Sequence, residues 1–139
     1  MSIVHLDLPD ARVLDLFAGS GALGLEAISR GARSADFIEA GPRSLDVLRR
    51  NIAALGAGER ARVIRADALR FVRTLEPHSY DIAFADPPFA SEGAAELARL
   101  WHERPFARIL GLEHPAGVAL PAGGEVRRYG TVAVTFYRS

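Results

Sequence analysis

The strongest structural signal in this 139-residue chain is the segment Arg12–Gly24, which reads R-V-L-D-L-F-A-G-S-G-A-L-G. Its first part, Arg12–Phe17, is an apolar run typical of a buried β-strand, and the segment Ala22–Arg30 has helical periodicity. The glycines between them match G-x-G-x-x-G, a turn that lets the backbone bend tightly and lets a ligand lie close to it. A strand, a glycine turn and a helix in this order predict the first unit of an α/β fold that binds a dinucleotide or another nucleoside cofactor.

Short apolar runs and helical segments alternate along the rest of the chain. Strands are expected at Arg12–Phe17, Ser34–Glu39, Arg62–Arg65, Tyr80–Ala85 and Ala107–Leu112. Helices are expected at Ala22–Arg30, Pro42–Leu55, Ala68–Leu75 and Ser91–Trp101. A turn at Pro121–Gly124 precedes an expected hairpin, Glu125–Tyr129 with Val132–Tyr137. Right-handed crossovers make this a doubly wound, mostly parallel sheet with a C-terminal antiparallel hairpin, so ligands should lie beyond the carboxyl ends of the strands. The turns of interest are those after Phe17, Glu39, Arg65 and Ala85.

The composition excludes several function classes. Hydrophobic residues make up 49% of the chain and charged residues 24%, which is typical of a globular protein. Seventeen basic and seventeen acidic residues cancel, so no chain-wide charge attracts nucleic acid or an anionic membrane. The absence of cysteine excludes disulfides, thiolate zinc sites and a cysteine nucleophile, and the absence of lysine excludes a Schiff base. No apolar run has the length of a membrane span or a signal peptide, which predicts a soluble, cytoplasmic protein.

The acid at position 15 distinguishes between the cofactors that such a glycine turn accepts. Asp15 lies near the end of the first strand, four residues before Gly19. A dinucleotide would place its pyrophosphate close by, and two anions in a partly dry pocket repel each other. S-adenosylmethionine has no phosphate and carries a sulfonium and an ammonium group, so a carboxylate attracts it. The alternative is that Asp15 caps the helix or is a solvated acid at the end of the strand.

Two more acids follow the second and third strands. Glu39 ends the second strand, eighteen residues after Gly21, where a carboxylate can accept hydrogen bonds from both ribose hydroxyls. After the third strand, Asp67 can accept from an adenine amino group while the backbone of Ala68 contacts the edge of the ring. The alternatives are a solvated strand-end acid for Glu39 and the N-cap of the next helix for Asp67. Acids at the ends of three successive strands together favour a nucleoside site.

The tetrapeptide Asp86–Phe89, D-P-P-F, ends the fourth strand and indicates the chemistry. Pro87 and Pro88 lack a backbone N–H and have a fixed φ, which predicts a stiff turn with outward-pointing carbonyls. The Asp86 carboxylate and a rigid carbonyl can accept both hydrogens of an exocyclic NH₂ and so aim the nitrogen lone pair at an electrophilic methyl group. Phe89 offers a flat face on which a splayed-out base stacks. The alternative is a structural turn with Phe89 in the core.

Methyl transfer from a sulfonium is an in-line displacement, so positioning the two reactants supplies most of the catalysis and no metal is needed. Asp86 can also accept a proton or stabilise the positive charge that grows on the nitrogen. The four histidines are scattered without the spacing of metal ligands. The motif therefore predicts a metal-free methyl transfer to an amino group.

Four features together resemble one protein family. They are D-L-F-A-G-S-G-A-L-G-L-E-A-I-S-R-G-A at Asp15–Ala32, the later Asn51, D-P-P-F at Asp86–Phe89, and R-R-Y-G-T at Arg127–Thr131. Over nearly the whole chain the sequence is similar to the bacterial small-subunit rRNA guanine-N2 methyltransferases, the RsmD-like family. The resemblance implies a class I methyltransferase fold, with residues 1–139 as one S-adenosylmethionine-dependent domain. It also implies methylation of a guanine exocyclic amine in 16S rRNA within an assembling small ribosomal subunit.

The resemblance also implies roles for individual residues. It implies that the methionine part of the donor is held by Asp15, Gly19 and Gly21. It implies Glu39 for the ribose, and Asp67 and Ala68 for the adenine. Phe17 and Asp86 complete the implied donor site. The residues implied to hold the target amine and carry the catalysis are Asp86, Pro87, Pro88 and Phe89. No metal ligand is implied.

The chain departs from the family at its N-terminus. Family members usually carry several dozen residues before the first strand, with a basic hairpin and a helix thought to close the donor site and grip RNA. Here eleven residues precede Arg12, and Met1–His5 resembles the last turn of that helix. We therefore expect the chain to fold and to bind the donor weakly, but to methylate RNA poorly.

Other functions stay open at this point. A methyltransferase that acts on adenine in nucleic acid or on a glutamine side chain would use the same acceptor geometry, although Asn commonly replaces Asp86 in those families. A non-catalytic protein that binds the donor or RNA is a second alternative, against which the intact D-P-P-F argues. Asp15 argues against a dehydrogenase. Arg127–Arg128 and Arg49–Arg50 could contact phosphate, but ordinary surface charge is the commoner reason for such pairs. His114 and Trp101 are expected to be structural.

Overall fold

The computed structural model describes residues 8–88 and 90–139, which form a seven-stranded sheet with four helices. The strands are β1 (Arg12–Leu16), β2 (Ser34–Glu39), β3 (Ala61–Arg65), β4 (Tyr80–Ala85), β5 (Ala107–Pro115), β6 (Glu125–Tyr129) and β7 (Val132–Arg138). The helices are α1 (Ala22–Ser29), α2 (Pro42–Ala54), α3 (Ala68–Arg73) and α4 (Ala90–Glu103). The strand order is β3-β2-β1-β4-β5-β7-β6, in which β1 to β5 are parallel and β7 and β6 are antiparallel. This confirms the doubly wound, mostly parallel fold with a C-terminal hairpin.

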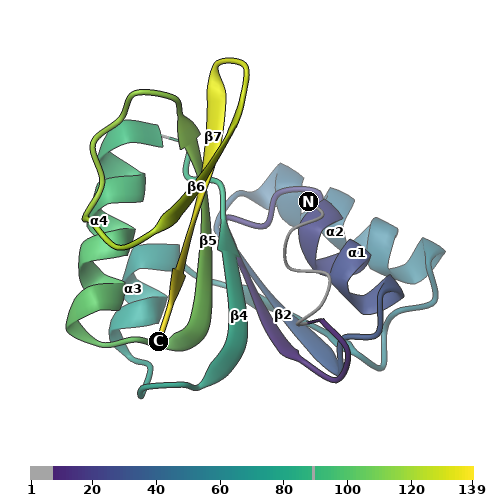
Figure 1. Ribbon diagram of the computed structural model, residues 1–139. Coiled ribbons are helices and arrows are strands. Elements are labelled where there is room, and N and C mark those ends of the chain that lie inside the picture. Colours follow the sequence, from purple (N-terminus) through teal and green to yellow (C-terminus); the bar gives the residue numbers. More distant parts are fainter. Residues whose placement is uncertain (1–7, 89) are drawn as a thin grey trace.

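Helices cover both faces of the sheet because successive residues of a strand point to opposite sides. In Figure 1, α1 and α2 lie on one side of the sheet and α3 and α4 on the other. Val13 of β1 belongs to a core cluster with Phe37 and with Leu48 of α2. The next residue, Leu14, belongs to a second cluster with Leu97 of α4. The two cores hold the strands in place, so the turns at the ends of the strands have fixed positions.

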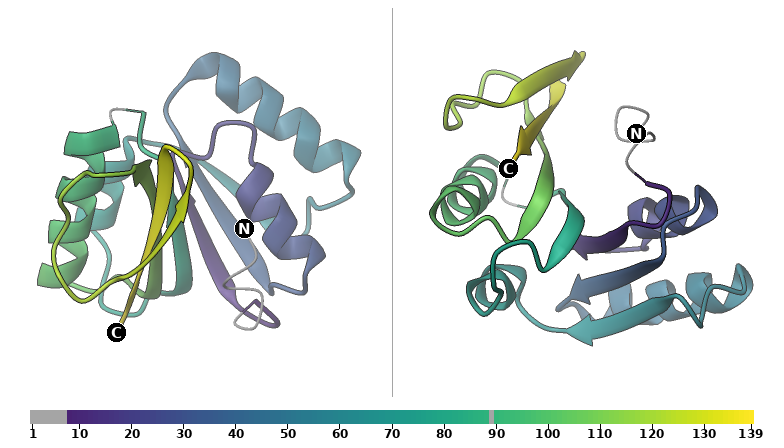
Figure 2. Two further views of the ribbon diagram at one scale, coloured as in Figure 1. Left: turned by 45° about the horizontal axis from the view of Figure 1, so that its top comes forward. Right: turned by 60° about the horizontal axis from the view of Figure 1, so that its bottom comes forward.

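The C-terminal hairpin extends the sheet past its parallel part, and its turn projects beyond the other strands (Figures 1 and 2). β7 pairs with β5 from Ile109 to Pro115. The expectation that the fifth strand ends at Leu112 is wrong, because β7 pairs with three further residues. All five residues of the outermost strand, β6, are exposed.

Several other expected boundaries shift by one or two residues. Phe17 does not continue β1 but begins the turn, with a φ of 56° in the left-handed region. The first two helices end at Ser29 and Ala54, and the third is shorter than expected and ends at Arg73. The fourth helix extends to Glu103. These are helix and strand ends, where terminal backbone groups find partners in neighbouring segments rather than in the element itself.

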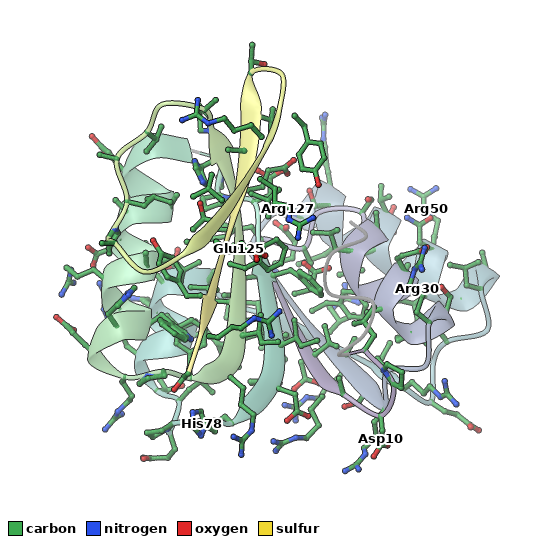
Figure 3. The ribbon with its side chains drawn as sticks, in the orientation of Figure 1. Asp10, Arg30, Arg50, His78, Glu125 and Arg127 are labelled. Carbon is green, nitrogen blue, oxygen red and sulfur yellow. The ribbon has the colours of Figure 1, made fainter. Side chains whose placement is uncertain are left out.

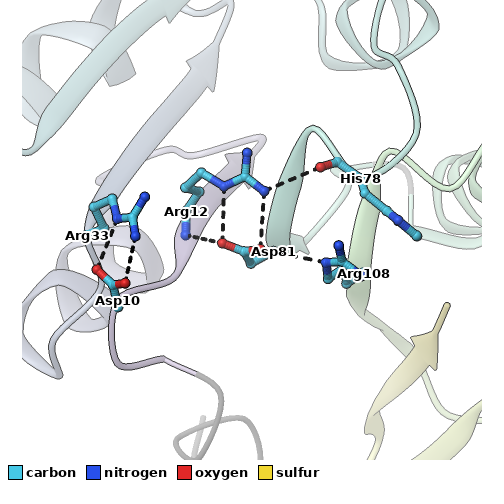
Figure 4. A network of polar contacts seen from close by, with 6 residues as sticks. All are labelled: Asp10, Arg12, Arg33, His78, Asp81 and Arg108. Carbon is cyan, nitrogen blue, oxygen red and sulfur yellow. Dashed lines mark hydrogen bonds and ion pairs between the residues drawn. The ribbon is translucent and has the colours of Figure 1, made fainter.

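Paired charges join the strands at the amino-terminal edge of the sheet (Figure 4). The backbone N–H and the Nε of Arg12 donate to Asp81 Oδ2 at 2.8 and 3.2 Å, and Arg108 Nε lies 3.9 Å from Asp81 Oδ1. Burial acts to raise the pKa of Asp81, but the hydrogen bonds and charge of Arg12 outweigh it, and the pKa lies below its ordinary value. Beside them, Arg33 pairs with Asp10. These contacts tie β1 to β4 and β5 on the edge opposite the predicted site.

Candidate functional site

The register of the parallel strands brings several predicted site residues to one edge. Leu16 of β1 pairs with Ile38 of β2 and with Ala85 of β4, and Ala85 pairs with Leu112 of β5. The residues that directly follow these paired positions are Phe17, Glu39, Asp86 and Glu113. The carboxyl edge of the sheet therefore carries three acids and one aromatic residue on four adjacent strands.

The glycine turn contains one open glycine and two packed ones. Gly19, with a φ of 56°, lines a cavity of about 400 Å³, and a Cβ added there would meet only a backbone oxygen at 4.0 Å. A Cβ on Gly21 would lie 2.4 Å from Leu48 Cδ1, and one on Gly24 would lie 2.4 Å from Phe37 Cε1. Gly19 thus faces the cavity, whereas Gly21 and Gly24 let α1 pack closely. The ligand contact predicted for Gly21 stays a prediction.

Hydrogen bonds hold this turn in position. Asn51 of α2 donates through Nδ2 to the carbonyl oxygen of Ser20 at 2.9 Å. The backbone N–H of Ala18 donates to Ile38 O at 3.0 Å, which fastens the turn to β2. Phe17, in the left-handed conformation, separates two cavities and lines both. A non-glycine residue adopts this conformation at some energetic cost, and the surrounding contacts maintain it here.

Asp15 lies below the glycine turn and is almost fully buried, with 2% of its surface exposed. Its Oδ2 accepts a hydrogen bond from the backbone N–H of Gly24, in the first turn of α1, at 3.0 Å. Burial raises the pKa of Asp15 to about 7, the Gly24 hydrogen bond acts against this, and the charge of Glu39 adds to it. The alternative of a solvated acid is therefore wrong. The helix-capping alternative holds, in that Asp15 accepts from the helix while also lining the 400 Å³ cavity.

Glu39 links the glycine turn to the start of α2. Its Oε1 accepts from the backbone N–H of Gly19 at 2.7 Å, and its Oε2 accepts from Gly41 N at 2.8 Å and Ala40 N at 3.1 Å. Each carboxylate oxygen can accept two hydrogen bonds, so these three contacts orient the group, fill Oε2 and leave Oε1 with capacity for one more, such as from a ribose hydroxyl. The side chain lines a second cavity of about 300 Å³.

The same 300 Å³ cavity contains the residues predicted for adenine. Asp67 and Ala68 line it, together with Phe17 and with Pro87 and Pro88 of the predicted catalytic turn. The N-cap alternative for Asp67 is confirmed, because its Oδ2 accepts from the backbone N–H of Arg70 at 3.0 Å. This contact fixes the carboxylate at the rim and does not conflict with a further hydrogen bond to a ligand.

The double-proline turn lies between the cavities. Pro87 is buried, Asp86 and Pro88 are exposed, and Asp86 lines the 400 Å³ cavity beside Asp15. A Cβ on Gly93 would lie 2.8 Å from Pro87 Cβ, so the first turns of α4 pack on the proline. The predicted stacking residue, Phe89, and the side chain of Ser91 lie outside the described residues. The turn therefore places Asp86 in the lining of the same cavity as Gly19 and Asp15.

Glu113 is a site residue that the sequence analysis missed. It lies in β5 next to Asp86, and both acids line the 400 Å³ cavity and a third cavity of about 440 Å³. Burial raises the pKa of Glu113, and a hydrogen bond and charge repulsion from Asp86 add to the shift. The sequence does carry a signal for Glu113, because this residue directly follows the expected fifth strand and so lies at the carboxyl edge. The turn after that strand was not among the four turns expected to hold the ligand.

The electrostatic character of the site is acidic. Five carboxylates line the three cavities, namely those of Asp15, Glu39, Asp67, Asp86 and Glu113. Among the described lining residues there is no arginine, although the chain has equal numbers of basic and acidic residues. The arrangement suits a ligand that carries positive charge and hydrogen-bond donors, and it repels phosphate.

Among the other residues considered in the sequence, His114 and Trp101 have structural contacts, and Arg127 and Arg50 pair with acids. His114 is buried and its Nε2 lies 2.7 Å from Thr135 Oγ1. Trp101 is buried and donates from Nε1 to Ala107 O at 2.8 Å. Arg127 lies 3.6 Å from Glu125 on the hairpin, and Arg50 pairs with an acid one helical turn away; both arginines are exposed and are labelled in Figure 3. A contact between these arginines and phosphate stays a prediction.

Membrane spans and metal clusters are both absent from residues 8–88 and 90–139. None of the helices in this part of the chain combines the length and the apolar character that a membrane span requires. Within the same residues, no group of three or more histidine, aspartate or glutamate side chains is arranged to hold a metal ion.

Comparison with known proteins relates this geometry to one family. Residues 1–110 match the family described as "Conserved hypothetical protein 95". The "Ribosomal RNA small subunit methyltransferase D" of Escherichia coli K12 is 49% identical over 81 residues, which are 58% of this chain. The matched segment spans 39% of the length of that relative. The Bacillus subtilis protein named "Putative rRNA methyltransferase YlbH" is 32% identical over 138 residues, covering 91% of this chain and 75% of the relative.

Solved structures share the fold over almost the whole chain. The "Putative methyltransferase yhhF from Escherichia coli" has a TM-score of 0.81 at 33% identity and covers 97% of this chain and 80% of the other. A hypothetical protein of Thermus thermophilus has a TM-score of 0.81 at 31% identity, covering 98% and 79%. These similarities confirm the Rossmann-like fold of class I methyltransferases.

Proposed function

The chain belongs to the conserved hypothetical protein 95 family, and on this basis we propose that it transfers a methyl group from S-adenosylmethionine to the exocyclic amine of a guanine in 16S rRNA. The names of the Escherichia coli and Bacillus subtilis relatives support an rRNA substrate. The matched residues 1–110 include the glycine turn and the D-P-P-F segment. We also propose that the reaction occurs in the cytoplasm, on an assembling small ribosomal subunit.

The acidic lining is the single observation that supports the cofactor best. A dinucleotide would bring its phosphates among carboxylates, without an arginine in the described lining to neutralise them. S-adenosylmethionine, when bound, supplies a methyl group on a positively charged sulfur, together with an ammonium group and a ribose. Asp15, which lines the 400 Å³ cavity, attracts the positive charge, and Glu39, which lines the 300 Å³ cavity, accepts from a ribose hydroxyl. Asp67 and Ala68 line the 300 Å³ cavity that would hold the adenine.

The double-proline turn positions the acceptor. Asp86 lies where the donor cavity meets the 440 Å³ cavity, so an amine bound to its carboxylate lies between the two. The carboxylate accepts one amine hydrogen and the rigid turn offers a carbonyl for the other, which orients the nitrogen lone pair toward the donor side. As the new N–C bond forms, the bond between the methyl group and the donor sulfur breaks and its electron pair stays on the sulfur, which becomes a neutral thioether. Asp86 stabilises the charge on nitrogen, and a proton leaves to its carboxylate or to water. The residues catalyse mainly by positioning.

Calorimetric titration tests the cofactor, and a labelled methyl-transfer assay tests the substrate. We expect S-adenosylhomocysteine to bind and NADH to give no heat of binding. With small-subunit particles and labelled S-adenosylmethionine, nuclease digestion should locate the label in N2-methylguanosine. Asp86→Ala should lose at least about 100-fold in transfer. Because Asp86 also lines the donor cavity, S-adenosylhomocysteine affinity is measured for the same variant and transfer is compared at saturating donor. Label in adenosine or in protein, or NADH binding in place of S-adenosylhomocysteine, would show that the proposal is wrong.

A further inference from the structure

The acid pair of Asp86 and Glu113 needs an explanation that the donor does not supply. The two residues are neighbours because Ala85 and Leu112, which precede them, pair in register. Both side chains line the 400 Å³ and the 440 Å³ cavities, so two acids face the same space. Asp86 has a role in positioning the amine, but a single carboxylate suffices for that. A second acid beside it adds charge repulsion, which is costly unless a ligand provides hydrogen-bond donors.

The surroundings of Glu113 show which ligand could provide them. Glu113 lines the 440 Å³ cavity, which lies between the end of β5 and the β6–β7 turn and includes His114, Thr131 and Val132. The described lining of this cavity contains no arginine that could neutralise Glu113. His114 has both ring nitrogens within hydrogen-bond distance of other groups, Thr135 Oγ1 and the carbonyl of Pro115. Glu113 is thus available to a ligand in the cavity.

Guanine fits this pair and adenine does not. The Watson–Crick edge of guanine presents N1–H and the exocyclic N2 amine side by side, which are adjacent donors for two adjacent carboxylates. Adenine presents an amine beside an unprotonated N1, so one carboxylate would face an acceptor. A site built to accept from an N–H group discriminates strongly against a ligand that lacks it, because a desolvated polar group is then left unpaired.

We propose that Glu113 accepts a hydrogen bond from N1–H of the target guanine while Asp86 accepts from its N2 amine, so that the acid pair selects guanine over adenine. The proposal rests on the function proposed above and assigns to Glu113 the choice of the base. With guanine bound, both carboxylates are acceptors, one for N1–H and one for a hydrogen of the N2 amine, and any proton that the free acid pair carries leaves to water. Burial and the neighbouring Asp86 raise the pKa of Glu113, and two hydrogen-bond donors from guanine would offset the repulsion between the acids.

Nucleotide titrations followed by protein NMR test the selection without requiring turnover. The protein, saturated with S-adenosylhomocysteine, is titrated with GMP, AMP, IMP and 2-aminopurine riboside monophosphate. IMP keeps N1–H but lacks the amine, whereas 2-aminopurine keeps the amine but lacks N1–H. We expect GMP to bind best, with shifts at the amides around Glu113 and Thr131. AMP and the 2-aminopurine nucleotide should each bind about tenfold more weakly, the effect of one hydrogen bond to a charged group.

Glu113→Gln removes the charge with little change in shape. The variant should lose about tenfold in GMP affinity, while its affinity for the 2-aminopurine nucleotide should not fall and should rise where the Gln amide donates to the unprotonated N1. The matched control is Glu125→Gln, the same change on the exposed strand β6, which should leave all four affinities unchanged. Because Glu113 also lines the 400 Å³ donor cavity, circular dichroism and thermal unfolding verify the fold of both variants, and the nucleotide titrations use saturating S-adenosylhomocysteine for each variant.

The possible outcomes separate this inference from the proposed function. Equal binding of GMP and AMP, absence of GMP-induced shifts near Glu113, or an unchanged GMP preference in Glu113→Gln would overturn the role of Glu113, even if the wild type methylates rRNA. If Glu113-dependent GMP selection is found but S-adenosylhomocysteine does not bind, the guanine site stands and the proposed function fails. If Glu113→Gln no longer binds S-adenosylhomocysteine, the test is the wild-type protein alone. Equal affinities of the wild type for GMP and for the 2-aminopurine nucleotide would then overturn the proposal.

Discussion

At the scale of single residues, the burial of Asp15 links donor binding to stability. A carboxylate with 2% exposure and a hydrogen bond from one backbone N–H is poorly solvated when ionised, and its pKa in the folded chain is about 7 against an ordinary 3.8. Between these values the unfolded chain has lost the proton while the folded chain still holds it. The free energy of unfolding therefore falls as pH rises from about 4 to about 7, by on the order of a few kcal/mol for this group. A cationic donor beside Asp15 would recover part of this cost.

The variant Asp15→Asn tests this cost. The amide keeps a carbonyl oxygen for the Gly24 N–H but has no charge, so we expect the variant to gain stability relative to the wild type as pH rises. The measurement is urea unfolding at pH 5, 6, 7 and 8, with Asp46→Asn on the exposed side of α2 as the control. S-adenosylhomocysteine should bind Asp15→Asn more weakly at pH 8. A stability difference between variant and wild type that does not change with pH would contradict the proposed cost.

At the scale of secondary-structure elements, two glycines set the distance between α1 and the sheet. A Cβ on Gly24 would lie 2.4 and 2.8 Å from ring carbons of Phe37 in β2 and 3.1 Å from Asp15 Oδ2. Phe37 is fully buried, so its ring has little space to move. The glycine turn keeps its shape only while α1 stays close to β2, which connects the helix packing to the cavity at Gly19.

Gly24→Ala should therefore lower the free energy of unfolding by about 1–3 kcal/mol, although alanine is the better helix former. Thermal or urea unfolding measures the loss. Gly58→Ala is the control, since nothing lies within 4 Å of a Cβ there and its φ is not in the left-handed region, and we expect it to be neutral or stabilising by less than about 1 kcal/mol. Equal effects of the two substitutions would show that α1 moves away from β2 without cost.

The same elements show why only part of the site could be predicted from the sequence. The apolar run before Gly19 and the periodicity of α2 are local patterns, so the strands, the helices and three acids at strand ends follow from them. The extension of β5 to Pro115 depends on pairing with β7, whose residues lie about twenty positions further along the chain. Glu113 becomes a partner of Asp86 only through the β4–β5 register, and no local pattern contains that contact.

At the scale of the whole molecule, a neutral chain has two different sheet edges. The amino-terminal edge has its acids Asp10 and Asp81 paired with arginines (Figure 4). The carboxyl edge collects acids around three cavities without an arginine in their described lining. The net charge of zero hides this asymmetry, which appears only when the parallel strands bring their carboxyl ends together. The acidic edge favours a cationic donor but does not by itself attract RNA phosphates.

Hydrogen exchange tests how stability is distributed over this sheet. β1 and β4 lie in its middle and are almost entirely buried, so their amides should exchange only through global unfolding. β6 is the outermost strand with all five residues exposed, and its amides should exchange fastest among the strands by local opening. The other edge strand, β3, is the internal control, because three of its five residues are half-buried and should give intermediate protection.

Addition of S-adenosylhomocysteine should slow exchange most at the glycine turn and the start of α2, where Glu39 holds the Gly19 and Gly41 amides, and little in β6. Uniform slowing across all strands, or protection of β6 equal to that of β4, would show that the sheet opens as one unit and that the hairpin is not a separate, less stable part.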